Sequence, residues 1–196
     1  ARNQLQKYVI EHSRFGIPAL LSSECPHGHQ ALDGYLLPVN LAAGCTFSPD
    51  LLEETAKVSG QQLKAMGIHL ALVSALDILR DPRWGRSEEC FGEDPYLTSV
   101  MGKAAVFGLQ GNDDTYFKSH ACAKHFAVHS GPESLRHSFD VTVSPRDLWE
   151  TYLPAFEALV TEANVQEVMG AYNRYAGDPC CSSDLLLMNI LRKRWN

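Results

Sequence analysis

The chain has 196 residues, of which 45% are hydrophobic and 20% charged, with a formal net charge of −6 and an isoelectric point near 5.7. This composition is typical of a folded globular protein, because disordered chains have few apolar residues and a high charge. The acidic surplus argues against a nucleic-acid partner, and no apolar run reaches the roughly 18 to 20 residues of a membrane span.

We therefore expect one domain over residues 1–196 that binds neither nucleic acid nor membrane. The first residues lack the charged and then apolar pattern of a signal peptide. We expect a secreted or periplasmic protein if such a peptide was removed, and a cytoplasmic protein otherwise.

Helix starts are marked at three places by Ser or Asp followed by Pro, at positions 48, 94 and 144. The side-chain oxygen can accept from a free backbone N–H, and Pro at the first helical position loses no hydrogen bond. Helices are predicted over residues 48–66, 94–110 and 144–164, and the first two end before Gly67 and Gly111. An apolar stripe predicts a further helix over residues 183–195, and the chain is expected to begin inside a helix at residues 4–12.

Short apolar segments between these helices predict strands at residues 18–21, 68–73, 119–126 and 165–172. Strands that alternate with helices form a mostly parallel sheet, so the fold class is α/β. No linker or low-complexity segment marks an internal boundary. Four or so strand–helix units make about half of an eight-stranded barrel, which needs about 250 residues.

Polar side chains lie at or just after the end of each predicted strand, where the reactive groups of parallel α/β folds lie. They include Glu24, Arg86, Lys124 and His125. A carboxylate accepts hydrogen bonds from neighbouring hydroxyls, while guanidinium, ammonium and imidazole groups donate to their oxygens. This mixture indicates a ligand with several hydroxyls, such as a monosaccharide.

Other chemistries could account for some of these polar residues. Glu24, Arg86 and Lys124 could form a structural ion-pair network, and a phosphate ligand is disfavoured because no Gly-rich loop is present. The histidine pairs 27/29 and 125/129 have metal-ligand spacing, but no Cys or carboxylate pattern completes a coordination sphere. The six cysteines are scattered, and we expect neither a metal nor a cofactor.

Four motifs in this order resemble glycoside hydrolase family 3, and the resemblance covers almost the whole chain. They are Asp81-Pro82-Arg83-Trp84-Gly85-Arg86, Phe91-Gly92-Glu93-Asp94-Pro95, Lys124-His125-Phe126 and Met169-Gly170-Ala171-Tyr172-Asn173. The segment 124–133 and Asp178-Pro179-Cys180-Cys181 resemble the bacterial β-glucosidases and β-xylosidases in particular. The resemblance implies a TIM-like (β/α) barrel, here about its first half to two thirds, and hydrolysis of terminal non-reducing β-D-glycosyl residues in a β-glycoside or small oligosaccharide.

The resemblance also implies roles for six residues in binding the substrate. Glu24 stands where the family has an acid on the O4 and O6 side of the sugar, although many members have Asp there. Arg86, Lys124 and His125 match the other groups that bind this sugar, and Met169 and Tyr172 match residues that pack beside its ring.

Further roles are expected around these six residues. Glu133, Arg136 and His137 are candidates for a neighbouring subsite, and Trp84 is expected to shape its loop. Asp94 is expected to cap a helix. The His27 imidazole is expected either to be buried and hydrogen-bonded or to contact the sugar.

Family 3 enzymes retain configuration by using two carboxyl groups, a nucleophile and an acid/base. The family's nucleophilic Asp follows a Leu-Arg-x-x-Trp helix. In this chain residues 191–195 match that pattern and are followed only by Asn196. We therefore expect no catalytic residue in this chain, and both carboxyl groups in a missing C-terminal part of the same enzyme. Residues 1–196 expressed alone are predicted to be inactive.

Two alternatives concern the function itself. The chain could be a non-catalytic sugar-binding or vestigial glycosidase-like module. Phosphorolysis or N-acetylhexosaminide cleavage is disfavoured because the Lys-His-Phe-Pro-Gly-His-Gly signature of that branch is missing. Both glucose and xylose fit the pattern.

Overall fold

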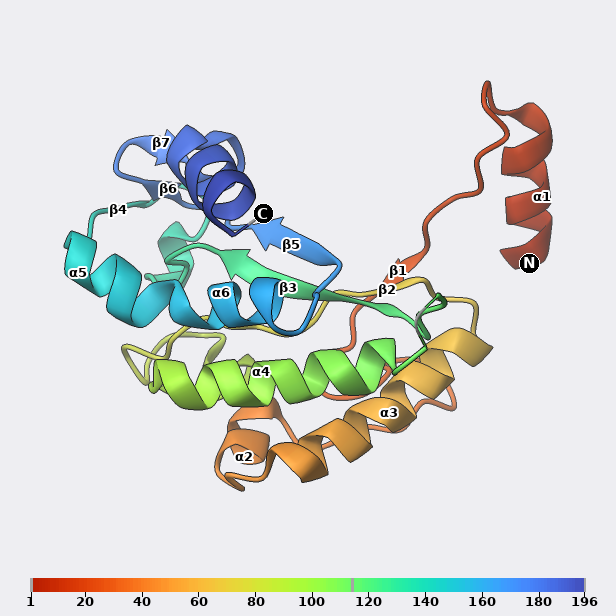
Figure 1. Ribbon diagram of the computed structural model, residues 1–196, viewed down its shortest axis with the longest axis horizontal. Helices are drawn as coiled ribbons and strands as arrows, with labels where there is room; N and C mark the ends of the chain where they lie inside the picture. Colours follow the sequence, from red (N-terminus) through yellow and green to blue (C-terminus); the bar gives the residue numbers. More distant parts are fainter. Residues whose placement is uncertain (1, 114, 196) are drawn as a thin grey trace.

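A four-stranded parallel sheet with helices packed along it forms the centre of the molecule (Figure 1), in a computed structural model that describes residues 2–113 and 115–195. The strand order is β1 (Ser22–Ser23), β2 (Leu70–Ala71), β3 (His120–Phe126) and β5 (Glu167–Gly170). Neighbouring strands pair in parallel, with Ser22 opposite Leu70, Leu70 opposite His120, and Cys122 opposite Glu167. All carboxyl ends of the strands therefore meet at one edge.

Helices α3 (Pro49–Ala65) and α4 (Pro95–Gln110) begin where the Ser-Pro and Asp-Pro pairs predict. Ser48 Oγ accepts from the Leu51 N–H at 3.4 Å, and Asp94 Oδ1 accepts from the Leu97 N–H at 2.6 Å. Helix α4 is followed by Gly111, whose φ of +80° is a conformation that glycine adopts without strain. The predicted helix-capping role of Asp94 is confirmed.

The third predicted helix, over residues 144–164, is divided in the structure. Ser144 caps α5 (Pro145–Asp147), a π-helical turn η3 (Leu148–Tyr152) follows, and α6 (Pro154–Thr161) completes the segment. Pro154 has no N–H to donate and its ring crowds the preceding turn, so a regular α-helix cannot run through it. The prediction of one continuous helix is wrong for this reason.

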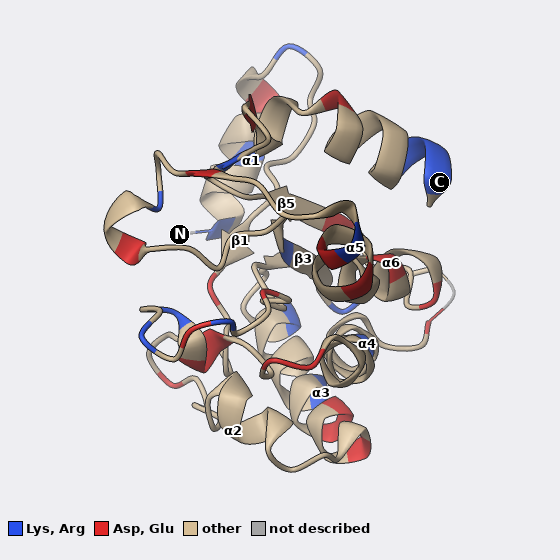
Figure 2. Ribbon diagram, turned by 90° about the vertical axis from the view of Figure 1, so that its left-hand side faces the viewer, with Lys and Arg blue, Asp and Glu red and all other residues tan. Residues whose placement is uncertain are grey.

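The last predicted helix is present as η5 (Asp184–Arg194), which has π-helical hydrogen bonding and is capped by Ser183. Its basic residues lie at the C-terminal end, marked blue in Figure 2, where the helix dipole favours positive charge. Near it lies a second small sheet of β4 (Asp140–Val141), β6 (Arg174–Tyr175) and β7 (Asp178–Pro179). The remaining short elements are α2 (Asn40–Gly44) and the 3-10 turns η1 (Ser87–Glu89), η2 (Glu133–Leu135) and η4 (Cys180–Ser182).

The first predicted strand, residues 18–21, is misplaced. The structure has β1 at Ser22–Ser23, and Leu20 before it is 61% exposed. The partner strand β2 sets this boundary, because only Leu70 and Ala71 lie opposite β1. Apolar residues alone could not reveal that limit.

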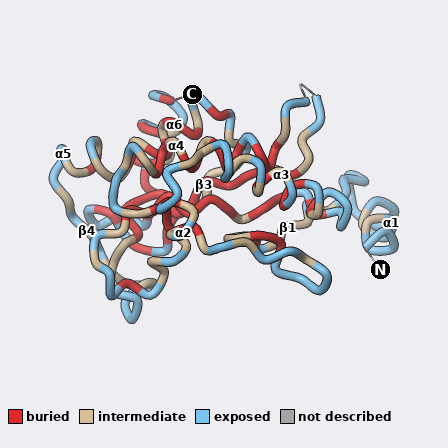
Figure 3. Tube along the Cα trace, turned by 90° about the horizontal axis from the view of Figure 1, so that it is seen from below, coloured by how far each residue is buried: buried red, intermediate tan, exposed pale blue. Residues whose placement is uncertain are grey.

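The hydrophobic core lies between the sheet and the helices, shown in red in Figure 3. The Phe126 ring, on β3, lies 5.1 Å from the Phe156 ring and 5.8 Å from the Trp195 ring, so it joins the sheet to α6 and η5. Helix α1 (Arg2–His12) stands apart from this core and has no buried residue (Figures 1 and 3). No described helix is long and apolar enough to cross a membrane.

Helices α3 and α4 make the most extensive helix–helix contact of the described chain, and glycines permit it. A Cβ atom added to Gly60 of α3 would lie 2.7 Å from the Leu109 carbonyl oxygen. One added to Gly108 of α4 would lie 2.5 Å from both Ala56 Cβ and the Glu53 carbonyl oxygen. The two backbones are therefore too close for any larger residue at these positions.

Candidate functional site

A polar cavity of about 310 Å³ lies at the carboxyl ends of the strands. It is lined by Glu24, Pro26, His27, Gln30, Arg86, Glu88 and Glu89. Glu24 follows β1, Arg86 lies in the loop after β2, and Lys124 and His125 are in the last part of β3. The structure thus brings together the four polar residues expected to converge. Lys124 contacts Glu24, and His125 contacts Arg86.

Arg86 is held in a defined orientation by Glu89. Its Nε donates to Glu89 Oε1 at 2.7 Å and its Nη2 to Glu89 Oε2 at 2.8 Å. The hydrogen bond to Glu89 raises the pKa of Arg86. Burial raises the pKa of Glu89, but the bond from Arg86 outweighs burial and leaves that pKa below its usual value. Both groups are therefore charged, and Arg86 still has Nη1 to offer.

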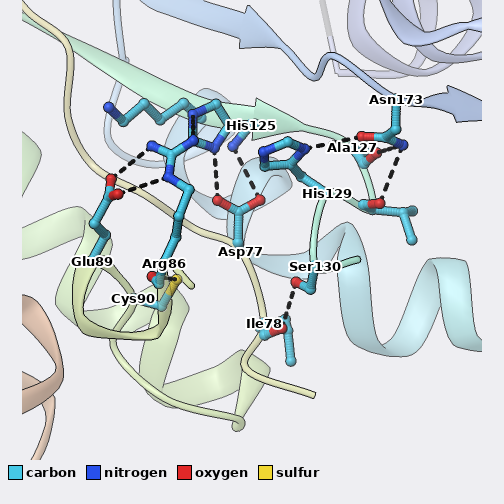
Figure 4. Close-up of polar contacts among 12 residues, drawn as sticks. Asp77, Ile78, Arg86, Glu89, Cys90, His125, Ala127, His129, Ser130 and Asn173 are labelled. Carbon is cyan, nitrogen blue, oxygen red and sulfur yellow. Dashed lines mark hydrogen bonds and ion pairs between the residues drawn. The ribbon is translucent and has the colours of Figure 1, made fainter. Parts of the chain in front are cut away.

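His125 lies between Arg86 and a buried carboxylate, Asp77 (Figure 4). Arg86 Nη1 is 3.2 Å from His125 Nε2, and Asp77 Oδ2 is 2.8 Å from His125 Nδ1. Burial raises the pKa of Asp77, but the hydrogen bonds from the ring and the backbone of His125 help to outweigh burial and lower that pKa. Asp77 is therefore a buried anion.

Lys124 is buried, and its ammonium group points towards the cavity side of the sheet. Its Nζ lies 3.3 Å from Glu24 Oε2, while the Glu24 side chain is 58% exposed. A buried ammonium group needs an anion or hydrogen-bond acceptor close by. Lys124 thus presents positive charge next to a carboxylate that solvent can still reach.

Met169 and Tyr172 lie on the β5 side of the site. Met169 is paired in register with Lys124, so it borders the site directly. The Tyr172 ring is exposed and lies 4.7 Å from the His137 ring and 6.4 Å from the His129 ring. This places Tyr172 at the rim of the site.

The loop residues expected around the site take the following positions. Arg136 is paired with Glu133 at 3.0 Å and lies 6.0 Å from the Tyr172 ring. Trp84 is buried, and its ring lies 6.1 Å from the His129 ring in a T-shaped arrangement. His27 is half-buried, lines the cavity, and has its Nδ1 3.0 Å from the Leu37 carbonyl oxygen.

Sequence reasoning missed four residues of the site: Asp77, Glu89, His129 and Asn173. His129 Nδ1 donates to Asn173 Oδ1 at 3.1 Å, because the Asn173 amide donates to the Ala127 and Val128 carbonyls. Burial lowers the pKa of His129, which is thus neutral near pH 7. Local signals existed for three of them: Glu89 follows Arg86 by three residues, His129 follows His125 by four, and Asn173 ends a family motif.

Two further observations limit what the site can do. Within residues 2–113 and 115–195, no three His, Cys, Asp or Glu side chains gather in a way that could hold a metal ion. An apolar pocket of about 240 Å³ lies between α2, α3 and α4 and shares Pro26 and His27 with the polar cavity. Glu24, Arg86, Glu88 and Glu89 line the polar cavity and not the apolar pocket.

Comparison with known families decides the classification. The family model described as the glycosyl hydrolase family 3 N terminal domain matches residues 1–196. This chain belongs to glycosyl hydrolase family 3. The predicted fold class, α/β with a parallel sheet that is part of a (β/α) barrel, is confirmed together with the family.

Relatives within family 3 are β-xylosidases and β-glucosidases. A xylan 1,4-beta-xylosidase of Xylanibacter ruminicola is 49% identical over 81% of the chain and 20% of its own length. A periplasmic beta-glucosidase of Salmonella typhimurium is 32% identical over 98% of the chain and 25% of its own length.

Solved structures of family 3 members match the chain closely. The β-glucosidase EmGH1 from Erythrobacter marinus gives a TM-score of 0.91 at 34% identity, over 97% of this chain and 26% of that one. The β-glucosidase from Listeria innocua, in complex with glucose, gives a TM-score of 0.87 at 35% identity, over 97% of this chain and 26% of that one. The chain thus spans about a fifth to a quarter of the length of these relatives.

Proposed function

We propose that the protein containing this chain hydrolyses terminal non-reducing β-D-xylosyl or β-D-glucosyl residues with retention of configuration. In this proposal, the chain supplies groups that hold the sugar. The observation that carries it is the convergence of Glu24, Arg86, Lys124 and His125 beside one polar cavity. Family membership and the relatives named as β-xylosidases and β-glucosidases support the same activity.

Each polar group has a chemical part in holding a pyranose. The exposed oxygens of Glu24 can accept from two neighbouring sugar hydroxyls, and Lys124 and Arg86 can donate to hydroxyl oxygens. Met169 and Tyr172 offer apolar surface beside the ring. Donors and acceptors held in place before the sugar arrives lower the cost of ordering the complex.

The reacting carboxyl groups are proposed to come from another part of the same enzyme. Three carboxylates at this site are already engaged, since Glu24 contacts Lys124, Asp77 contacts His125, and Glu89 contacts Arg86. A retaining enzyme needs a nucleophile and an acid/base about 5 to 5.5 Å apart. Glu88 also lines the cavity but is exposed to solvent.

The test uses the full-length enzyme with 4-nitrophenyl β-xyloside and β-glucoside. The xyloside comes first, because the relative at 49% identity is named a xylan 1,4-beta-xylosidase. Proton NMR of the first-formed sugar should show the β-anomer, as retention requires. Lys124→Ala should lower kcat/KM at least ten-fold, since it removes a charged donor.

Two matched variants separate this proposal from its alternatives. Arg146→Ala removes an exposed cation, paired with Glu150 on α5 and η3, and should leave kcat/KM unchanged. Glu88→Gln should also retain activity, and its inactivation would mean that this chain supplies a reacting carboxylate. Sugar binding without turnover of either glycoside would instead favour the non-catalytic module.

A further inference from the structure

Asp77 is the feature of this site that the proposed function leaves unexplained. Asp77 and Lys124 are the only Asp, Glu, Lys or Arg residues that are buried in the part of the chain that the structure describes. The Asp77 side chain is 1% exposed, so it cannot touch a sugar in the cavity. A carboxylate is costly to bury unless hydrogen bonds compensate for its lost hydration.

Both compensating hydrogen bonds come from His125, which is 48 residues away in sequence. The ring Nδ1 lies 2.8 Å from Asp77 Oδ2, and the backbone N–H of His125 donates to Asp77 Oδ1 at 3.4 Å. Asp77 therefore contacts both the ring and the backbone of this one residue. The two contacts together restrict rotation of the imidazole.

The contacts on both sides of the ring also determine where its proton lies. An arginine can only donate, so His125 Nε2 must accept from Arg86 Nη1, and the proton of the neutral ring lies on Nδ1, facing Asp77. Arg86 is itself fixed by its two bonds to Glu89. Figure 4 shows the resulting series of contacts from Asp77 through His125 and Arg86 to Glu89.

We propose that Asp77 is a positioning residue for glycoside hydrolysis, acting through His125. It keeps the proton of His125 on Nδ1, so that Nε2 accepts from Arg86 Nη1 and helps to hold that guanidinium beside the cavity where a sugar can meet it. The inference rests on the proposed function, because a sugar must bind at this site for the orientation of His125 to matter.

The substitution Asp77→Asn distinguishes this role from simple space filling, because it preserves shape and removes one acceptor. If the amide oxygen faces the backbone N–H of His125, the amide NH₂ faces the ring and forces its proton onto Nε2. That proton would then oppose the donor of Arg86. If the amide is reversed, its NH₂ opposes the backbone N–H, so either orientation leaves one mismatch.

The experiment compares Asp77→Asn, His125→Gln and the double variant in the full-length enzyme, on whichever glycoside is hydrolysed faster. Asp77→Asn should lower kcat/KM by roughly ten- to a hundred-fold, which is the scale of one unsatisfied buried polar group. The double variant should be no slower than His125→Gln alone, because Asp77 acts only through that ring. Asp81→Asn, in the same loop but partly exposed and paired with Arg83, should change kcat/KM less than two-fold.

Two kinetic outcomes would overturn the proposal. One is an Asp77→Asn enzyme within two-fold of the wild type. The other is a double variant whose loss equals the product of the two single losses, which indicates a structural effect independent of His125. If Asp77→Asn does not fold, neutron diffraction on the wild type decides: a deuteron on Nδ1 alone supports the proposal, and one on Nε2 overturns it.

Failure of the proposed function gives a different result. If the wild type hydrolyses neither glycoside, calorimetry with xylose and glucose measures binding instead. Weaker sugar binding by Asp77→Asn than by the wild type would retain the role of Asp77 while rejecting hydrolysis. Equal affinity, or no sugar binding by the wild type, would overturn the role of Asp77 as well.

Discussion

Replacing Arg86 by Lys is the most direct probe of the site, because it keeps the charge and removes the geometry. Arg86 makes three contacts, two with Glu89 at 2.7 and 2.8 Å and one with His125 at 3.2 Å. A lysine ammonium is a single point and cannot reach all three positions. Its side chain would satisfy Glu89 or approach His125, but not both.

The size of the effect follows from the bonds that are lost. The Arg86 side chain is 16% exposed, so water replaces these bonds poorly. Losing one charge-assisted hydrogen bond costs about 2 to 3 kcal/mol, which corresponds to a decrease in kcat/KM of roughly 30- to 150-fold. The assay is hydrolysis of 4-nitrophenyl β-xyloside by the full-length enzyme.

Arg83 provides a control within the same loop. It also forms an arginine–carboxylate pair, with Asp81, but its side chain is 89% exposed, and such pairs contribute little. Arg83→Lys should therefore change kcat/KM by less than two-fold. The reasoning is refuted if Arg86→Lys keeps wild-type activity, or if Arg83→Lys loses as much as Arg86→Lys.

Three other predictions concern stability, measured as the free energy of unfolding in denaturant. Phe126→Ala should cost about 3 to 5 kcal/mol, because its ring fills the core between α6 and η5; a loss below 1 kcal/mol would contradict the packing described. Asp94→Ala should cost about 1 kcal/mol by removing the cap of α4, and Asp94→Asn should restore most of it. Burial lowers the pKa of His129 in the folded protein. As the pH decreases, the imidazole is therefore protonated in the unfolded chain before it is protonated in the folded one, and the free energy of unfolding should fall through about pH 6.5. His129→Asn should reduce this pH dependence between pH 7.5 and 5.5, and an unchanged slope would argue against a buried neutral ring.

Features set by local chemistry could be predicted from the sequence. The starts of α3 and α4 follow from Ser48 and Asp94, whose side chains bond the backbone three residues on. The division of the segment after Ser144 could also have been predicted, because Pro154 is visible in the sequence and interrupts a helix for a local reason.

Features set by distant partners could not be predicted in this way. The extent of β1 depends on where β2 lies, and the apolar residues at 18–21 carry no information on that register. Glu24, Arg86, Lys124 and His125 were found because they follow strands or occur in family motifs. Asp77 also follows a strand, but its importance comes from a contact with His125 that no spacing along the chain reveals.

Gly60 and Gly108 restrict how this sequence can diverge. Even a methyl group at either position would meet backbone or Cβ atoms within 2.7 Å, so an alanine there requires α3 and α4 to move apart. Because α4 also packs against β3, which carries Lys124 and His125, such a movement would reach the site. Laboratory evolution of new sugar preferences should therefore vary the loops after the strands and leave this helix pair unchanged.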